Sequence, residues 1–463
     1  MNCRQVQTQI DNEWRRLGAR YLPHVRPKSI WRYGNTALKD EIVQGWKLHI
    51  SATILNANDV LKAVAPVLNE LQVPFKAPVS MNELMKINAG IYYGYSQVGK
   101  FITVYPHEQS KVVELANNLY QRTLPFSSPH VPFDGGFMPN GSVYYRYGAF
   151  RNSFAVDSEG VQTPTIRTAS GEIIPDDRTI TCSAQYGIPN PFRLHPNAAG
   201  GTSPLDSKYR IFEALSQRGK GGVYKAYEFG IDPPRLCIVK EGRKDGEVQW
   251  DGRDGAWRVK RERLVLSELR CRGLNVPSVI DTFELDGNFY LVTEFINGET
   301  LKELLRNKER SIRPTEFLDL AGQLAKLLAM IHSAGWVWRD CKPANLIVSD
   351  DGSLRPIDFE GACILAESDP LPWSTPGYSR SGAFYEETTK AEAGDDLFAL
   401  GSTIRAMLDF AEMDKSLRSN LKTIIDELQD RKPGYEPSAQ HIANRIMRLN
   451  TASKIYRSRN GSK

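Results

Sequence analysis

The chain has 463 residues, of which 41% are hydrophobic and 24% are charged, a balance typical of a soluble globular protein. Its net charge of +5 comes without a dense block of Lys or Arg, so neither a nucleic acid nor a membrane surface is an expected partner. No apolar run reaches the ~18 residues of a membrane span, and the polar N-terminus lacks the apolar core of a signal peptide. We therefore expect a cytoplasmic protein.

Strand and helix patterns follow one another in the N-terminal part of the chain. The predicted elements are a strand at 46–54, a helix at 56–72, a strand at 100–106, a helix at 110–123 and a strand at 143–150. Residues 1–40 show no clear period, so we predict no element there. Together these patterns indicate an α+β domain over residues 1–150.

The composition changes after this first domain. Residues 151–203 are rich in Gly, Pro and Asn and poor in periodic apolar residues, which predicts a linker or irregular segment. A third block, 204–450, has strand patterns first and helical patterns afterwards, with the clearest helix at 316–336. The short basic end, 451–463, is predicted to be a frayed tail.

Two stretches of the third block, WRDCKPANLIV and IDFEGA, carry polar residues suited to phosphoryl transfer. These residues are Asp340, Lys342, Asn345 and Asp358. Asp340 can orient a hydroxyl group and take its proton, and Lys342 can neutralise a migrating phosphoryl group. Asn345 and Asp358 offer oxygen ligands of the kind that Mg²⁺ prefers. Their order and spacing resemble the catalytic loop and metal-binding motif of protein kinases.

Other motifs follow the order of a protein kinase. By this resemblance, the residues assigned to nucleotide binding are Gly219, Gly221, Gly222, Lys240, Glu262, Glu294 and Ile296. The stretch SQRGKGGVYKA is similar to a Gly-rich phosphate loop, and Lys240 to the lysine that binds the α- and β-phosphates, with Glu262 as its ion-pair partner. The resemblance implies a bilobal fold, with an N-lobe over 204–297 and a C-lobe over 298–450. It also implies the use of ATP or GTP with Mg²⁺.

The kinase motifs depart from their usual pattern at several positions. Trp338 stands where a His is usual, and Glu360 stands where a Gly usually follows Asp-Phe. Ser216 and Arg218 replace the first two glycines of the phosphate loop. Because the metal-binding and base residues are intact, a functioning kinase is favoured over a pseudokinase that only binds nucleotide as a scaffold.

The strand GWKLHISAT suggests a second site, because alternate residues of a strand project from the same face. Lys47 and His49 therefore lie side by side. Lys76 lies in VPFKAP, where apolar neighbours and a nearby ammonium would lower its pKa and make it a usable base. Lys100 stands at a strand start, and Arg146, among tyrosines, offers a donor fork for phosphate. A solvated outer face is the alternative reading of Lys47 and His49.

The stretches GWKLHISAT, GKFITVYP, YYRYGAF, KGGVYKAYE, CIVKEGR and DGRDG resemble class III and class IV lanthipeptide synthetases over residues 35–450. The resemblance implies an N-terminal phosphothreonine-lyase-like domain followed by the kinase. It implies that Lys76 takes the Cα proton of a phosphoserine or phosphothreonine and that His49 protonates the leaving phosphate. The phosphate would be bound by Lys47, Lys100 and Arg146. The expected substrate is a precursor peptide with a leader, and the product contains dehydroalanine or dehydrobutyrine.

Several alternatives stay open. The zinc-binding cyclase that ends these synthetases has no recognisable Cys and His set here, so we expect no ring formation by this chain. Either a separate cyclase acts on the product, or the product stays linear, or the sequence is part of a longer chain. A Ser/Thr kinase whose N-terminal domain only docks the peptide is the other enzymatic reading.

Overall fold

The computed structural model describes residues 3–35, 42–151, 154–156, 160, 162–179, 187–192, 203–307, 311–369, 375–379, 389–430 and 437–460. The chain divides into two compact units. The first consists of Met1–Arg235, Val239–Trp257 and Phe283–Tyr290. The second consists of Leu236–Ile238, Arg258–Thr282 and Leu291–Lys463.

A seven-stranded sheet with all-antiparallel pairing lies at the centre of the first unit, in the order β1-β2-β4-β5-β3-β7-β6. Its strands are β1 (His24–Val25), β2 (Trp31–Gly34), β3 (Gln44–Ile50), β4 (Phe75–Pro78), β5 (Ile102–Val104), β6 (Gly135–Gly136) and β7 (Val143–Ala149). Along β3, Leu48 and Ile50 are fully buried and belong to the hydrophobic core. Because side chains alternate, the intervening Lys47 and His49 belong to the opposite face.

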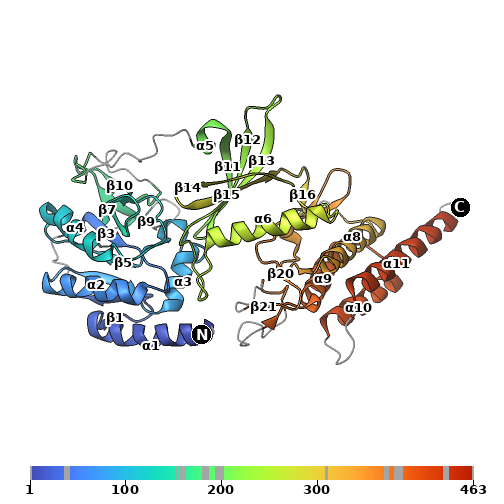
Figure 1. The fold of residues 1–463 in the computed structure, drawn as a ribbon, viewed down its shortest axis with the longest axis horizontal. Helices are drawn as coiled ribbons and strands as arrows, with labels where there is room; N and C mark the ends of the chain where they lie inside the picture. Colours follow the sequence, from blue (N-terminus) through green and yellow to red (C-terminus); the bar gives the residue numbers. More distant parts are fainter. Residues whose placement is uncertain are drawn as a thin grey trace. The chain divides into compact units, whose positions relative to one another are not determined.

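Helices cover the sheet of the first unit. They are α1 (Cys3–Tyr21), α2 (Ala57–Glu70), α3 (Met81–Ala89) and α4 (Val112–Thr123), with single 3₁₀ turns at Tyr95–Gln97 and Gln109–Lys111. Helix α2 packs against both α1 and α4 and lies between the sheet and α1 (Figure 1). The sequence did not predict α1. Among its described residues only Trp14 and Gly18 are buried, so its apolar stripe is too narrow to give a clear period.

The segment predicted to be a linker or irregular contains a three-stranded sheet, in the order β10-β9-β8. Its strands are β8 (Phe154–Val156), β9 (Gln162–Arg167) and β10 (Ile173–Pro175). Parts of 151–203 lie outside the described residues. The difference from the prediction has a simple cause, since only Thr165 and Ile166 are buried in these strands, which is too few to produce a visible alternation.

The predicted change from strands to helices after residue 204 is observed. After the short helix α5 (Pro204–Ser207), five strands form a sheet in the order β11-β12-β13-β15-β14. They are β11 (Tyr209–Arg218), β12 (Gly221–Glu228), β13 (Arg235–Gly242), β14 (Val279–Leu285) and β15 (Asn288–Glu294), with α6 (Gly255–Cys271) between β13 and β14. The chain is thus α+β, with a sheet-rich part followed by a helical part, as predicted.

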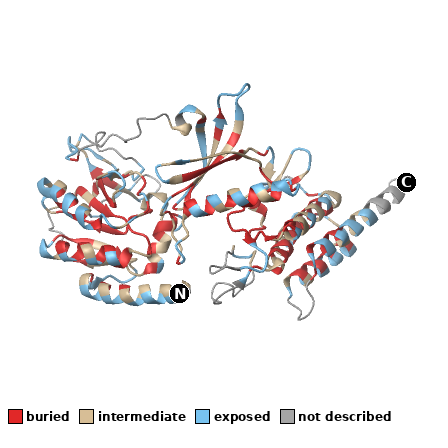
Figure 2. Cartoon of the chain, viewed as in Figure 1, coloured by how far each residue is buried: buried red, intermediate tan, exposed pale blue. Residues whose placement is uncertain are grey.

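Helices dominate the second unit, where α8 packs against α9 and α11, and α9 packs against α10. The helices are α7 (Leu301–Arg306), α8 (Pro314–Ser333), α9 (Ala393–Leu408), α10 (Lys415–Gln429) and α11 (Ala439–Asn460). The short strands are β16 (Glu299–Thr300), β17 (Trp336–Val337), β18 (Leu346–Val348), β19 (Leu354–Pro356), β20 (Cys363–Ile364), β21 (Ser368–Asp369) and β22 (Thr389–Lys390), and a 3₁₀ turn spans Pro343–Asn345. Buried residues gather in the seven-stranded sheet and along α8 and α9 (Figure 2).

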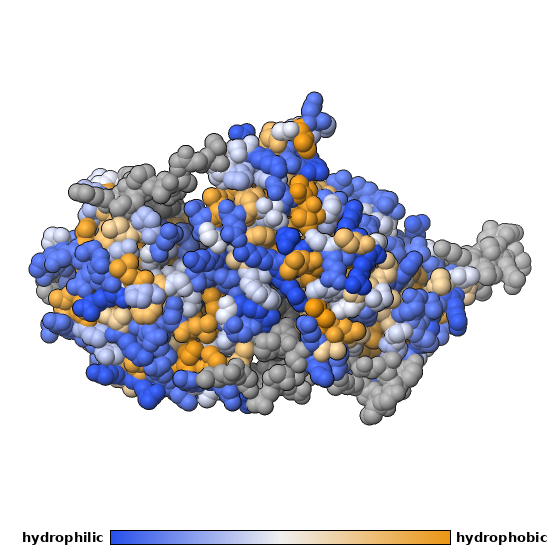
Figure 3. Space-filling view, viewed as in Figure 1, coloured by the Kyte–Doolittle hydropathy of each residue, from blue (hydrophilic) through white to orange (hydrophobic). Residues whose placement is uncertain are grey.

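The predicted frayed tail differs from the structure, because α11 continues through residue 451 to Asn460. The sequence of α11 contains neither Gly nor Pro, so nothing in it ends the helix earlier. Residues 461–463 lie outside the described part. In the space-filling view of Figure 3, hydrophobic residues form separate small groups on a mainly hydrophilic surface. Among the described helices, none is both long enough and apolar enough to cross a membrane.

Candidate functional site

The register of the seven-stranded sheet brings four predicted residues to one face. Lys76 on β4 and His49 on β3 both pair with Thr103 on β5, so they lie in one cross-strand row. Lys47, two residues before His49, pairs with Arg146 on β7. Directly paired residues share a face, and neighbouring strands lie about 4.8 Å apart. The backbones of Lys76 and His49 are therefore roughly 10 Å apart, with one strand between them.

Asp134, which the sequence did not suggest, connects two of these residues. Nδ1 of His49 lies 2.5 Å from Oδ2 of Asp134, and Nζ of Lys100 lies 3.0 Å from Oδ1. Burial by itself would raise the pKa of Asp134, but the charges of Lys100 and His49 and their hydrogen bonds lower it to about 2. The carboxylate is thus ionised at neutral pH. It holds the His49 proton on Nδ1 and leaves Nε2 to exchange protons.

Several basic groups of this face have pKa values below the ordinary values of their side chains. Burial, followed by the charges of Arg178, Lys100 and Arg26, lowers the pKa of Lys76 to about 8. The sequence had pointed to Lys47 as the like charge beside Lys76. The Lys76 ammonium lies 4.3 Å from the centre of the Trp31 ring. An amine in these surroundings is substantially neutral near pH 8, as a general base requires.

Burial also lowers the pKa values of the neighbouring Lys47 and His49. For Lys47 the pKa falls to about 7, although the Asp176 carboxylate opposes the shift, and its ammonium donates to the carbonyl of Ala149 at 2.9 Å. For His49 the pKa falls to about 4, because burial and Lys100 outweigh the effect of Asp134. Lys47 and His49 thus both have other cations close by, and the charges of these cations add to the effect of burial.

Arg146 is buried and is held by the segment that follows β10. It donates to the Asp176 carboxylate at 2.6 Å and to the carbonyl of Asp177 at 2.9 Å. Its Nε is buried and makes no hydrogen bond with any described residue. A buried guanidinium donor with no acceptor is costly unless an anion accepts from it, so this atom fits a phosphate ligand.

In the second unit, Asp340 lies at the centre of a hydrogen-bonded group. Lys342 Nζ is 2.8 and 2.9 Å from its two carboxylate oxygens. Thr375 donates its hydroxyl to Asp340 Oδ1 at 2.8 Å, and Asn345 donates its amide to Oδ2 at 2.7 Å. Burial and the nearby charge of Asp358 raise the pKa of Asp340.

The backbone of this loop is held by Asp396 of α9, whose side chain is fully buried. Its carboxylate accepts from the amides of Trp338 and Arg339 at 2.8 and 2.6 Å. It also lies 2.9 Å from Nε2 of His332. Arg339 adopts a positive φ of 67°, which is unusual for a residue with a side chain and which these bonds help to stabilise.

Trp338, which replaces the usual His, has a clear structural function. Its indole N–H donates to the carbonyl of Asp358 at 2.9 Å, and its ring stacks on Phe359 with centroids 5.2 Å apart. The amide of Phe359 in turn donates to Glu262 Oε1 at 3.1 Å. The tryptophan therefore positions the Asp358 segment from one side and leaves the Asp340 carboxylate in place.

The donor set of this site fits Mg²⁺. Asn345 uses its amide nitrogen for Asp340, so its oxygen is the atom suited to a cation. The charge of Asp358 raises the pKa of the buried Asp340, so the two carboxylates lie near one another. A hard cation between oxygen ligands relieves such repulsion.

The predicted phosphate loop belongs to the first unit. A Cβ at Gly219 would lie 1.6 Å from the carbonyl oxygen of Asn88, and a Cβ at Gly221 would lie 1.7 Å from that of Glu241. Both glycines are thus required by close packing of the chain itself. At Gly222 a Cβ would meet the side chain of Tyr224.

The remaining nucleotide residues lie in both units. Lys240 is half-buried on β13, and its predicted ion pair with Glu262 would join the two units and stays a prediction. Ile296 is buried after β15. Glu294 donates its amide N–H to the carbonyl of Ser278 at 3.0 Å, so the group it would offer to adenine is its own carbonyl.

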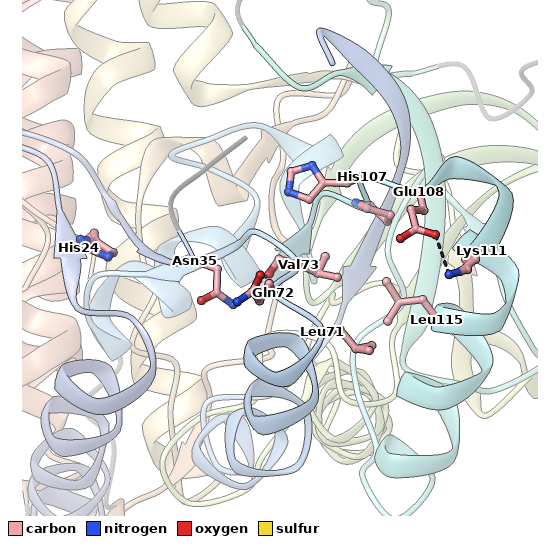
Figure 4. A pocket seen from close by; sticks show the side chains of 10 residues that line it. His24, Asn35, Leu71, Gln72, Val73, His107, Glu108, Lys111 and Leu115 are labelled. Atoms are coloured by element: carbon pink, nitrogen blue, oxygen red, sulfur yellow. Dashed lines mark hydrogen bonds and ion pairs between the residues drawn. The ribbon is translucent and has the colours of Figure 1, made fainter. Parts of the chain in front are cut away.

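A cavity of about 630 Å³ lies elsewhere in the first unit, as Figure 4 shows. Among its lining residues, His24 belongs to β1, Gln72 and His107 lie in two separate connections, and Glu108 forms an ion pair with Lys111 at 2.7 Å. None of the predicted site residues lines it. We therefore base the candidate chemistry on the cross-strand row.

Two family matches cover most of the chain. Residues 15–203 match the RamC N-terminal domain, and residues 211–452 match the protein kinase domain. The chain belongs to the protein kinase family. Its kinase domain is preceded by a RamC N-terminal domain, so the predicted resemblance to class III and class IV lanthipeptide synthetases is confirmed at the level of these two domains.

Individual relatives match different shares of the chain. The probable SapB synthase of Streptomyces coelicolor is 29% identical over 362 residues, which are 75% of this chain. The serine/threonine-protein kinase F of Synechocystis is 31% identical over 166 residues, and PknA of Nostoc is 27% identical over 209 residues, or 34% and 43% of this chain. The chain spans only 38%, 33% and 36% of the lengths of these three relatives.

Asp134 and Asp176 are the functional candidates that sequence patterns missed. Asp134 directly precedes the two-residue strand β6, and Asp176 directly follows β10. Both lie in connections that have no period. The pairing of β6 with β7 and the contact of β9 with β7 bring them to Lys100 and Arg146. The single available signal was the Asp-Gly-Gly stretch at Asp134, which predicts a turn and no chemistry.

Proposed function

We propose that this chain is a peptide dehydratase. Its kinase domain, over 204–450, phosphorylates Ser or Thr of a ribosomally made precursor peptide with a leader. Its N-terminal domain, over 1–150, then removes the phosphate to leave dehydroalanine or dehydrobutyrine. The observation that carries the proposal is the cross-strand row in which Lys76 and His49 flank Thr103 on one face of the sheet. Both lie among buried cations, in the same chain as a kinase loop.

Phosphoryl transfer needs an oriented hydroxyl and neutralised charge. Asp340 orients the peptide hydroxyl and accepts its proton as the oxygen bonds to the γ-phosphorus of ATP or GTP. Lys342, which contacts Asp340, neutralises charge on the migrating group. The bond from the γ-phosphorus to the bridging oxygen breaks, and the nucleoside diphosphate leaves. Mg²⁺, bound through Asn345 and Asp358, would supply charge neutralisation for the phosphates.

Elimination needs a base within reach of the Cα proton and an acid within reach of the leaving phosphate oxygen. Lys76, with a pKa of about 8, takes the Cα proton as a neutral amine. The electron pair of that C–H bond forms the Cα–Cβ double bond. The Cβ–O bond breaks, and the phosphate leaves with its electron pair after receiving a proton from Nε2 of His49.

The pKa of His49, about 4, sets a condition on this mechanism. Even beside the Asp134 carboxylate, the imidazole is neutral at pH 7 when no substrate phosphate is bound, and its Nε2 then has no proton to donate. A bound phosphomonoester carries a charge of about −1.5 to −2 and stabilises the imidazolium. Lys47, Lys100 and Arg146 would hold that phosphate. The substrate thus creates the protonated His49 that its own elimination requires.

The test is intact mass spectrometry of a Ser- and Thr-containing precursor peptide incubated with the protein, ATP or GTP, and Mg²⁺. Wild type should convert the peptide through a phosphorylated intermediate to a product that has lost water. Lys76→Ala should stop at the phosphopeptide. Asp358→Asn should leave the free peptide unmodified but still eliminate phosphate from a synthetic phosphopeptide. Lys62→Ala is a matched control, because Lys62 is a partly exposed lysine of the same domain.

Two outcomes would contradict the proposal. If wild type itself stops at the phosphopeptide, the N-terminal domain only docks the peptide. If no variant or wild-type protein turns over nucleotide, the kinase domain is a binding scaffold. The proposal does not include the formation of thioether rings, whether a separate cyclase forms them or the product stays linear.

A further inference from the structure

The turn of the phosphate loop packs against the end of helix α3 within the first unit. The amide N–H of Gly219 donates to the carbonyl of Ala89 at 3.0 Å. Gly90, which caps α3 with a φ of +73°, lies beside the same loop, where its Cβ would be 3.3 Å from the Gly219 nitrogen. A side chain at Gly219 would overlap the carbonyl of Asn88, and the positive φ of Gly90 disfavours a side chain there.

Arg243 reinforces this contact from the strand side. Its Nη1 donates to the carbonyl of Arg218 at 3.1 Å, and its amide donates to the carbonyl of Lys220 at 2.8 Å. Its guanidinium carbon lies 5.0 Å from the centre of the Tyr95 ring. Arg243 thus fixes both sides of the loop and rests on an aromatic ring of the N-terminal domain.

Tyr95 and Asn88 are themselves anchored beside the candidate lyase residues. The Tyr95 ring packs edge-on against Phe133, 5.8 Å away, and Phe133 immediately precedes Asp134. Asn88 is buried, donates to the carbonyl of Ala52 at 3.1 Å and accepts from the amide of Gly99 at 3.3 Å. A second contact, from Ser127 Oγ to the Asp245 carboxylate at 2.9 Å, lies on the turn that follows Arg243.

We propose that Tyr95 is a positioning residue of the kinase: through Arg243 it holds the phosphate loop in a shape that binds nucleotide. This inference rests on the proposed function, since it presumes that the loop binds nucleotide. Gly-rich loops are flexible, and a loop that is ordered beforehand loses less entropy when its ligand binds. The N-terminal domain would therefore raise nucleotide affinity in addition to carrying the elimination.

The test compares nucleotide KM and kcat for phosphorylation of the precursor peptide by the full chain. Tyr95→Ala should raise the KM for nucleotide roughly five- to tenfold, the effect of losing one cation–π contact, with a smaller change in kcat. Tyr95→Phe keeps the ring and should restore most of the affinity. Tyr92→Ala is the matched control, because Tyr92 lies in the same segment and is 67% exposed.

Arg243→Lys tests the other side of the contact, because a lysine keeps the charge but not the planar stacking. Combined with Tyr95→Ala, it should show a non-additive effect on KM, as expected for two residues that act through one contact. Thermal unfolding and elimination from a synthetic phosphopeptide confirm that each variant is folded.

The outcomes separate this inference from the proposed function. If wild type phosphorylates no peptide, the proposed function fails. If wild type phosphorylates the peptide but Tyr95→Ala keeps the wild-type KM, or if the double variant is additive, the positioning function of Tyr95 is wrong. A lower KM in Tyr95→Ala would also overturn it, because the contact would then hinder nucleotide binding.

Discussion

In the proposed function, the two candidate sites of this chain act on the same phosphate group but carry opposite charge. The N-terminal site collects cations, and burial lowers the pKa values of Lys47 and Lys76 to about 7 and 8. The site in the second unit collects carboxylates, and burial with the charge of Asp358 raises the pKa of Asp340. In both places burial disfavours the charged form of the groups that are concentrated there.

The comparison indicates that each site is completed electrostatically by what it binds. A phosphate dianion would stabilise the imidazolium of His49 and the ammonium of Lys47. A divalent cation would stabilise the carboxylates of Asp340 and Asp358. Under the proposed function, one step would therefore depend on a metal and the other would not, and the following experiments test that difference.

Removal of the metal should separate the two sites most strongly. Chelation with EDTA should lower phosphorylation of the free peptide by about 10³-fold or more, because the metal supplies several kcal/mol of charge stabilisation. Elimination from a synthetic phosphopeptide should continue at the same rate. Both rates are measured by mass spectrometry, and added Mg²⁺ should restore the first. A loss of elimination in EDTA would show that the N-terminal site also needs a metal.

Asp134→Asn should affect only the cationic site. An amide cannot balance the charges of Lys100 and His49 or hold the His49 proton on Nδ1, so elimination should fall on the order of 10²–10³-fold. Phosphorylation should be unchanged. The control is Asp59→Asn, since Asp59 is an exposed carboxylate of the same domain. Equal elimination by Asp134→Asn and wild type would mean that His49 needs no fixed tautomer.

These residues also show what the sequence could and could not predict. Lys47 and His49 were placed on one face because a strand has a period of two residues. The row that joins His49 to Lys76 depends on β5 lying between β3 and β4, and this order follows from sheet assembly. Asp134 reaches the other site residues only when its connection folds over the sheet. Long-range strand pairing therefore determines the part of the site that local sequence patterns could not predict.

The kinase motifs were easier to place, because Asp340, Lys342 and Asn345 lie within six consecutive residues. A short loop brings them together without any long-range pairing. The effect of Trp338 could not be predicted from the motif, since its partners Asp358 and Phe359 lie on another segment.

The pH dependence of elimination should reflect three groups. Lys76 must lose its proton to act as a base, so its titration raises kcat/KM with pH until about 8. Lys47 must keep its proton to bind phosphate, so its titration lowers kcat/KM as pH rises above about 7. His49, with a pKa of about 4, must gain a proton as the substrate binds, and this requirement lowers kcat/KM further as pH rises.

Lys47→Arg provides the matched test of the falling limb. An arginine stays protonated throughout this range, so the ratio of kcat/KM for the variant to kcat/KM for wild type should rise roughly tenfold for each pH unit above about 7. The measurement is kcat/KM for a phosphopeptide across the pH range. A ratio that does not change with pH would show that the titration of Lys47 does not contribute to the fall in kcat/KM.

Trp338→Phe should give the smallest effect and should be confined to the carboxylate site. The phenyl ring can still stack on Phe359, but the hydrogen bond to the Asp358 carbonyl is lost, which costs about 1 kcal/mol of stability. Phosphorylation should fall a few-fold because the Asp358 segment is held less firmly, and elimination should not change. In thermal unfolding, the transition of the kinase domain is the one whose midpoint temperature rises when nucleotide is added.

Trp338→His, which restores the residue usual in kinases, should be more destabilising than Trp338→Phe. The Trp338 side chain is fully buried, and an imidazole is much smaller than the indole that it would replace, so a cavity would remain beside Phe359. The loss should be roughly 2 kcal/mol. If Trp338→His is as stable as wild type, then the indole does not fill this place as described. The carboxylate site would then tolerate the usual residue, and its departure from the kinase pattern would have no structural cause.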